Sequence, residues 1–120
     1  MESATDDLKE LIKVRGFQVT PPELEGQLLD HPDIVDAAVI GVPDPSRESE
    51  LPRAYIVRRP GDGQRLTAQQ VHKHMRERLA SYKQLEGGVV FVDAIPKNAS
   101  GKILKRILRE QAKTEMASKL

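Results

Sequence analysis

Cysteine is absent from this chain, and aromatic residues make up only 3% of its 120 residues. The lack of thiols excludes disulfides, thiolate metal sites and a cysteine nucleophile, and it is compatible with a reducing compartment. Long apolar runs are lacking too: no stretch approaches the roughly 18 residues of a membrane-spanning helix, so the sequence predicts no membrane span. Charge of one sign is not in excess either, because 19 Lys and Arg face 18 Asp and Glu. This balance provides no general attraction to nucleic acid.

The chain does contain alternating short apolar strands and helical patterns, in a length that fits one domain with a modest core. Thr20 before Pro21, and Thr67 before an apolar stripe, are typical helix N-caps. Arg15 and Gly16 lie between two short apolar runs and predict a tight hairpin. We expect strands at residues 11–14, 17–19, 34–42, 52–57 and 89–92, and helices at 20–30, 67–79 and from 103 onward. The predicted fold class is α+β, a small mixed β-sheet with flanking helices plus an N-terminal β-hairpin.

A loop with the sequence Pro-Lys-Asn-Ala-Ser-Gly-Lys, residues 96–102, presents one lysine directly before a helical pattern. Ser100 and Gly101 allow a tight turn. Lys102 lies at the junction, where its ammonium group can be aimed at a phosphate or a carboxylate. The turn taken alone also fits a solvated lysine, so its functional interpretation depends on the rest of the chain. The apolar stripe of the helix is expected at Ile103, Leu104, Ile107 and Leu108.

The last three residues match a targeting signal. Ser118, Lys119 and Leu120 form the tripeptide that the peroxisomal import receptor reads at a free C-terminus. We therefore expect a peroxisomal location and this receptor as a partner. For the domain organisation we expect a disordered leader at residues 1–5, one folded domain at 6–112 and a flexible tail at 113–120 that carries the signal.

Several segments together carry a family resemblance. Asp-Asp-Leu-Lys-Glu-Leu-Ile-Lys-Val-Arg-Gly-Phe-Gln-Val at residues 6–19 is followed by Pro-Glu-Leu-Glu at 22–25 and Ala-Ala-Val-Ile-Gly-Val-Pro-Asp at 37–44. Tyr-Lys at 82–83, Gly-Gly-Val-Val-Phe-Val at 87–92 and the lysine loop come after them. In this order they closely resemble the mobile C-terminal domain of adenylate-forming (AMP-binding) enzymes, in the branch of 4-coumarate:CoA ligase, acyl-CoA synthetases and firefly luciferase. The resemblance runs from Asp6 to about Arg109 and is specific, because all the segments occur in the order of the family.

The resemblance implies a part in two half-reactions. In such enzymes a large N-terminal domain binds ATP, Mg²⁺ and a carboxylic acid, and the C-terminal domain closes over it. The lysine that matches Lys102 then stabilises charge while the carboxylate attacks the α-phosphate. Rotation about a hinge that matches Lys9 brings the hairpin to the active site for attack by the CoA thiolate. The residues that match adenylate-binding positions are Lys13 and Gln18, and those that match the CoA channel are Arg15, Gly16 and Phe17.

The sequence departs from the family pattern at two positions. The family usually has Asp-Arg-Leu-Lys at the hinge, and Asp7 stands where the arginine that helps to hold the ribose and the hinge is expected. Ser49 replaces a common glycine and should change only a loop. The resemblance implies ATP, Mg²⁺ and CoA for the complete enzyme and none bound by this domain alone. We therefore expect the chain to be inactive without an N-terminal adenylation domain.

Other interpretations stay open. A free-standing binding module that docks in trans on an adenylation domain or a carrier protein fits the same residues, and so does a luciferase-like oxidative step. The acceptor thiol is either CoA or that of a carrier protein, because the pocket that selects substrates belongs to the other domain. His31, His72 and His74 lack the spacing and partners of a metal site, so we predict none. We also predict no nucleic-acid binding, because no aromatic residues interleave the basic residues Lys102, Lys105, Arg106 and Arg109.

Overall fold

The structure is a computed structural model that describes residues 11–117. The expected leader at residues 1–5, Asp7, the predicted hinge residue Lys9 and the tripeptide Ser118, Lys119 and Leu120 lie outside these residues.

The centre of the fold is a three-stranded mixed sheet, as the sequence predicted. Strand β3 (Ile34–Pro43) pairs antiparallel with β4 (Glu50–Arg58), and β4 pairs parallel with the short β5 (Val89–Phe91). The strand order is β3-β4-β5, so β3 is an edge strand. β-branched and small apolar residues fill β3, which suits a strand that is buried on both faces.

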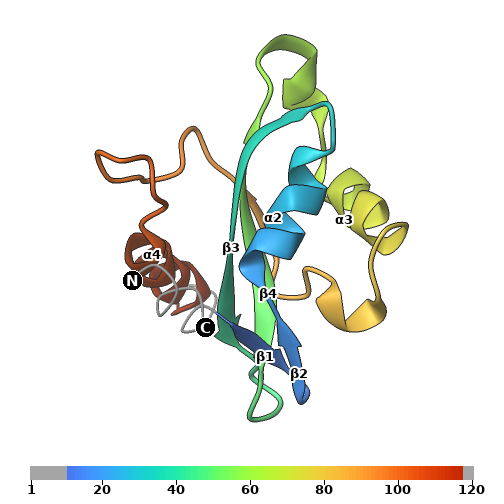
Figure 1. Ribbon diagram of the computed structural model, residues 1–120, viewed down its shortest axis with the longest axis vertical. Coiled ribbons are helices and arrows are strands. Elements are labelled where there is room, and N and C mark those ends of the chain that lie inside the picture. The colour runs from blue at the N-terminus through green and yellow to red at the C-terminus, as the bar shows by residue number, and fades with distance from the viewer. Residues whose placement is uncertain (1–10, 118–120) are drawn as a thin grey trace.

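Helices cover both faces of this sheet. Figure 1 shows α2 (Pro21–Leu29) and α3 (Ala68–Arg76) to one side of β3 and β4, and α4 (Lys105–Ala117) to the other. Because side chains alternate along a strand, Val39 contributes to the core under α2 and α3, whereas Ile40 contributes to the core under α4. Two short 3₁₀ helices, η1 (Gly61–Arg65) and η2 (Ser81–Lys83), lie in the connections.

A separate two-stranded hairpin precedes α2, again as predicted. Strands β1 (Ile12–Val14) and β2 (Phe17–Val19) pair antiparallel around Arg15 and Gly16. Both turn residues have positive φ, +48° and +88°, which is typical of a type I′ turn and its right-handed strand twist. Ile12 is buried in the core that also holds α2, so the hairpin is packed onto the domain.

The two predicted N-caps differ in the structure. Thr67 forms a complete capping box: its hydroxyl accepts from the Gln70 amide at 3.2 Å, and its amide donates to the Gln70 side chain at 3.0 Å. Thr20 occupies the N-cap of α2, yet its side chain makes no capping hydrogen bond. The two prolines that follow it have no N–H, and the Glu23 amide bonds to the Thr20 backbone carbonyl at 3.1 Å.

The last helix was predicted wrongly at both ends. It begins at Lys105 and not at Ile103, because Ile103 forms an antiparallel bridge with Lys97 and closes the lysine loop. At the other end α4 continues to Ala117, so residues 113–117, which were expected in a flexible tail, are helical. In α2 the sequence places Leu24, Leu28 and Leu29 on one apolar face. Leu24 and Leu28 are buried, but Leu29, at 46% exposure, lies outside the core.

Candidate functional site

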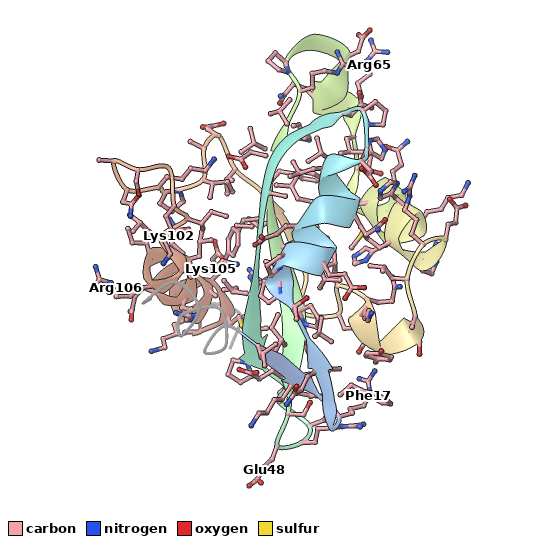
Figure 2. The ribbon with its side chains drawn as sticks, viewed as in Figure 1. Phe17, Glu48, Arg65, Lys102, Lys105 and Arg106 are labelled. Atoms are coloured by element: carbon pink, nitrogen blue, oxygen red, sulfur yellow. The ribbon has the colours of Figure 1, made fainter. Side chains whose placement is uncertain are left out.

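The predicted functional side chains form two groups on different parts of the fold. Lys102 lies in the loop between β5 and α4, and the other group lies on the β1-β2 hairpin. Figure 2 shows Lys102 on the α4 side of the sheet and Phe17 at the tip of the hairpin, on the opposite side of the molecule. Lys102 and the tip of the hairpin therefore lie on different parts of the surface of the domain.

Asn98 organises the loop that carries Lys102. Its side-chain oxygen accepts hydrogen bonds from the Ser100 amide at 3.0 Å, the Ser100 hydroxyl at 2.8 Å and the Lys102 amide at 3.0 Å. The Asn98 amide donates to the Lys102 carbonyl at 2.9 Å, and Gly101 completes the turn with a φ of +88°. An Asn that bonds the backbone two residues further on is a typical Asx turn. The backbone at Lys102 is therefore fixed, while its side chain is exposed.

The two ends of this loop are held together and attached to β3. The Leu104 amide donates to the Pro96 carbonyl at 2.9 Å, next to the bridge between Lys97 and Ile103. The Lys97 ammonium group lies 2.6 Å from a carboxylate oxygen of Asp36 on β3. The loop is thus a closed, anchored structure and not an extended connection.

A pocket of about 500 Å³ lies beside the loop, between the starts of α2 and α4. Lys102, Lys105 and Arg106, which Figure 2 labels together, line it with Arg109, and Glu25 is the acidic side chain in its wall. An excess of cations in a concave surface favours an anion. Lys105 differs from its exposed neighbours, because its ammonium group donates to Glu25 at 2.7 Å and to the Val39 carbonyl at 2.6 Å.

Lys13 and Gln18, the two predicted adenylate-binding residues, lie directly opposite each other on the hairpin. Ile12 and Val14, on either side of Lys13, are buried, so the strand alternation turns Lys13 and Gln18 outward. The Lys13 amide donates to a carboxylate oxygen of Glu50 at 3.0 Å, which attaches the hairpin to the start of β4. The structure therefore brings this pair together on one exposed surface.

The tip of the hairpin is held by an aromatic stack. The Phe17 ring lies against Tyr82, with ring centroids 4.1 Å apart and an interplanar angle of 16°, while Phe17 remains 51% exposed. The Arg15 guanidinium pairs with Glu86 at 3.4 Å. Gly16 at the tip has a φ of +88°, and a Cβ there would meet nothing within 4 Å. Its conformation, and not its surroundings in this domain, requires glycine.

Two charged side chains near the hairpin have shifted pKa values. Lys83 on η2 lies 2.7 Å from Glu23 on α2, and this hydrogen bond raises the pKa of Lys83. Hydrogen bonds from the Ser46 amide and hydroxyl lower the pKa of the Asp44 carboxyl in the loop between β3 and β4. Both groups therefore keep their ordinary charges at neutral pH.

Arg53 on β4 connects the sheet to the C-terminal end of α4. Its guanidinium donates to the Gly87 carbonyl at 2.8 Å, to Glu115 at 2.6 Å and to the Tyr55 hydroxyl at 3.2 Å. The Tyr55 hydroxyl donates to Glu115 at 3.0 Å, and burial raises the pKa of Tyr55. Burial alone would lower the pKa of Arg53, but its hydrogen bonds to Tyr55 and Glu115 raise it. Within residues 11–117, Arg53 is the charged residue that is buried, at 6% exposure.

Two of the three histidines meet between α2 and α3. The rings of His31 and His74 make an edge contact with centroids 5.1 Å apart, and His31 accepts a hydrogen bond from the Asp33 amide at 3.0 Å. Burial and the neighbouring His74 lower the pKa of His31. In the described part of the chain no group of three or more His, Asp or Glu side chains could hold a metal ion. Nor does any helix there have the length and apolar character to cross a membrane.

The sequence predicted Lys102 but not the residues that hold its loop in place. Asn98 could have been found, because an Asn before a Ser-Gly turn is a local signal. The contacts of Lys105 with Glu25 and of Arg53 with Glu115 join positions 80 and 62 residues apart, and no local pattern indicates them.

Known proteins match this chain along most of its length. A sequence model described as the AMP-binding enzyme C-terminal domain matches residues 23–102. An acyl-CoA synthetase of Alternaria alternata is 58% identical over 92% of this chain and 19% of its own length. A phenylacetyl-CoA ligase of Aspergillus niger is 56% identical over 88% of this chain and 19% of its own length. The chain thus spans about a fifth of the curated relatives that it matches.

Solved structures agree with the sequence comparison. The crystal structure of an anthranilate CoA ligase in complex with anthranoyl-AMP superposes with a TM-score of 0.80 at 36% identity. The match covers 92% of this chain and 21% of that one.

Proposed function

The chain belongs to the family of AMP-binding enzyme C-terminal domains, and on this premise we propose that it is the closing domain of an ATP-dependent acyl- or aryl-CoA ligase. The observation that carries the proposal is the placement of its two groups of polar residues. Lys102 lies on an anchored loop at one side of the sheet, and Phe17, at the tip of the hairpin, lies at the other. A domain that serves two half-reactions in two orientations needs this separation.

In the first half-reaction Lys102 supplies positive charge. Lys102 is an exposed residue on a backbone that Asn98 and Gly101 hold in place, so the loop presents it in a defined position. A preorganised cation stabilises the charge that develops as carboxylate oxygen attacks the α-phosphate. Its role is electrostatic, and proton transfer is not required of it.

In the second half-reaction the hairpin faces the substrate. Lys13 and Gln18 form a polar pair on its exposed face and are suited to hydrogen bonding with an adenylate. Arg15, Gly16 and Phe17 at the tip line the path of the CoA thiol, and the glycine leaves its backbone accessible. Rotation between the two orientations is assigned to Lys9, which precedes the described residues.

The described residues fit these substrates only in part. Lys102, Arg106 and Lys13 offer cations for phosphate groups, which suits ATP and the diphosphate of CoA. Among residues 11–117 no group of three or more His, Asp or Glu side chains could hold a metal ion. From the family we assign the binding of Mg²⁺ and of the carboxylic acid to the N-terminal domain of the complete ligase. ATP supplies the adenylyl group and CoA the thiol, and this chain contributes positioning and charge.

A chimera tests the proposal. The C-terminal fifth of the Aspergillus niger phenylacetyl-CoA ligase is replaced by this chain, and phenylacetyl-CoA formation is followed with phenylacetate, ATP, Mg²⁺ and CoA. The unaltered ligase and its truncated N-terminal part are the positive and negative controls. We expect the chimera to form thioester well above the truncated protein. A chimera no more active than the truncated protein would contradict the proposal.

Docking in trans is the second candidate, because the domain has its own core on each face of the sheet. Mixing the separate chain with the truncated N-terminal part distinguishes the two arrangements. Thioester formation in the mixture that is lost with Lys102→Ala supports docking in trans. Activity in the chimera alone supports a covalently joined domain.

A further inference from the structure

The outer edge of strand β3 has an ion pair attached to its backbone at Val39. The Val39 amide donates to a carboxylate oxygen of Glu25 at 2.9 Å, and the Val39 carbonyl accepts from the Lys105 ammonium group at 2.6 Å. The same carboxylate oxygen lies 2.7 Å from that ammonium group. The pair occupies the side of β3 that has no neighbouring strand, since β3 is at the edge of the sheet.

The pair joins three elements, α2, β3 and α4, at one point. Glu25 lies on α2, which covers one face of the sheet, and Lys105 is the first residue of α4, which covers the other. Only 15% of the Glu25 side chain and 13% of the Lys105 side chain are exposed. At such low exposure a charge that loses its partner is poorly solvated, so the pair is held in one geometry.

The loop of Lys102 lies directly beside this pair. Lys105 follows Lys102 by three positions in the chain, and Lys102, Glu25 and Lys105 line the same pocket. The other end of the loop is attached to β3 by the pair between Lys97 and Asp36 at 2.6 Å. Both ends of the loop are therefore attached to β3, one at Asp36 and the other at Val39.

We propose that Glu25 and Lys105 are positioning residues for adenylation, which clamp the end of the Lys102 loop to the edge of β3. The inference rests on the proposed function. Neither residue touches the substrate; both determine where the Lys102 ammonium group lies when the domain closes. A displacement of about 1 Å of a catalytic group can lower a rate about 100-fold, so the clamp affects adenylation strongly. The thioester half-reaction, which uses the hairpin, does not depend on it.

The clamp has a fixed polarity. Its carboxylate must face the Val39 N–H, and its ammonium group must face the Val39 carbonyl. A carboxylate cannot accept a hydrogen bond from a carbonyl, and an ammonium group cannot donate one to an amide N–H. The charge-swapped double variant Glu25→Lys with Lys105→Glu therefore fails to restore what either single substitution loses. A simple ion pair would be restored by the swap. Lys105→Arg keeps the cation and retains most of the function.

Hydrogen exchange on the 120-residue chain tests the structural part. Glu25→Gln keeps an acceptor for the Val39 amide and removes the carboxylate that pairs with Lys105. We expect loop amides to exchange about tenfold faster, while the sheet amide of Ala54 changes little. Glu110→Gln, an exposed acid on α4, the helix of Lys105, is the control and should change neither. Unchanged loop protection, or equal acceleration in loop and sheet, would overturn the clamp. The amides to follow are those of Asn98, Gly101, Lys102 and Leu104.

The chimera with the Aspergillus niger ligase tests the functional part. Adenylation is measured as phenylacetate-dependent ATP-pyrophosphate exchange, and thioester formation is measured from synthetic phenylacetyl-adenylate and CoA. We expect Glu25→Gln to lower the exchange rate about 10- to 100-fold and the thioester rate less than about twofold. Loss of exchange with Lys102→Ala but not with Glu25→Gln overturns the clamp and leaves the proposed function intact. Normal exchange with Lys102→Ala overturns the proposed function itself. An equal fall of both rates with Glu25→Gln also overturns the clamp, because the clamp predicts a selective loss of adenylation.

Discussion

Replacing Arg53 by Met should destabilise the domain through one end of α4. The substitution introduces an apolar side chain of similar length. It removes the donors to the Gly87 carbonyl at 2.8 Å, to Glu115 at 2.6 Å and to the Tyr55 hydroxyl at 3.2 Å, which keeps its own bond to Glu115. Glu115 is 37% exposed and keeps its hydrogen bond from Tyr55, so water compensates part of its loss. One hydrogen bond to a charged group and one unpaired carbonyl together cost about 2–3 kcal/mol.

Urea unfolding of the 120-residue chain, followed by circular dichroism, measures this cost. In thermal unfolding, Arg53→Met should lower the Tm by about 10 °C. Arg47→Met is the matched control, because Arg47 is 56% exposed and its carboxylate partner lies 3.7 Å away. Such a surface pair contributes less than about 1 kcal/mol. If Arg53→Met were no more destabilising than Arg47→Met, the reasoning about the buried network would be refuted.

Three further predictions concern stability and are checked by urea unfolding. Burial lowers the pKa of His31 in the folded chain below its ordinary value of 6.5, so the unfolded chain binds this proton more readily. The free energy of unfolding should therefore be steady above pH 6.5 and decrease as the pH falls below it. In His31→Asn this decrease should be smaller. Gly88 has a φ of +111°, and a Cβ there would lie 2.9 Å from the Arg53 side chain, so Gly88→Ala should destabilise the domain by about 1–3 kcal/mol. Gly26 lies in a helix with open space around it, so Gly26→Ala should stabilise the domain by about 0.5–1 kcal/mol. Removing the ring in Tyr82→Ala takes away the stack on Phe17 and should cost about 1 kcal/mol, and an unchanged midpoint would show that the stack does not hold the hairpin tip.

Local patterns were sufficient for most of the fold. Gly16 between two short apolar runs predicts the hairpin, because glycine adopts positive φ readily, and the β-branched run of β3 predicts a buried strand. The positive φ of Arg15 was not predicted. The start of α4 was missed because Ile103 and Leu104 fit a helical stripe as well as they fit the closed loop. The choice between these depends on the bridge to Lys97, which a periodicity argument does not include.

The positions of the functional side chains depend on contacts between distant segments. The sequence identified Lys102 and the hairpin residues by family resemblance, but not what holds them. Glu25 and Lys105 are polar residues on separate amphipathic helices, and their meeting at Val39 results from packing α2 and α4 on opposite faces of one strand. The strand pattern around Arg53 does not indicate that its guanidinium lies 2.6 Å from Glu115.

The most direct test of the central claim is the effect of Lys102→Ala on the two half-reactions of the chimera. A single preorganised cation is worth about 100- to 1,000-fold in rate, so adenylation from phenylacetate and ATP should fall by that factor. Thioester formation from phenylacetyl-adenylate and CoA should continue at close to the unaltered rate. Equal losses in both half-reactions, or no loss of adenylation, would contradict the account.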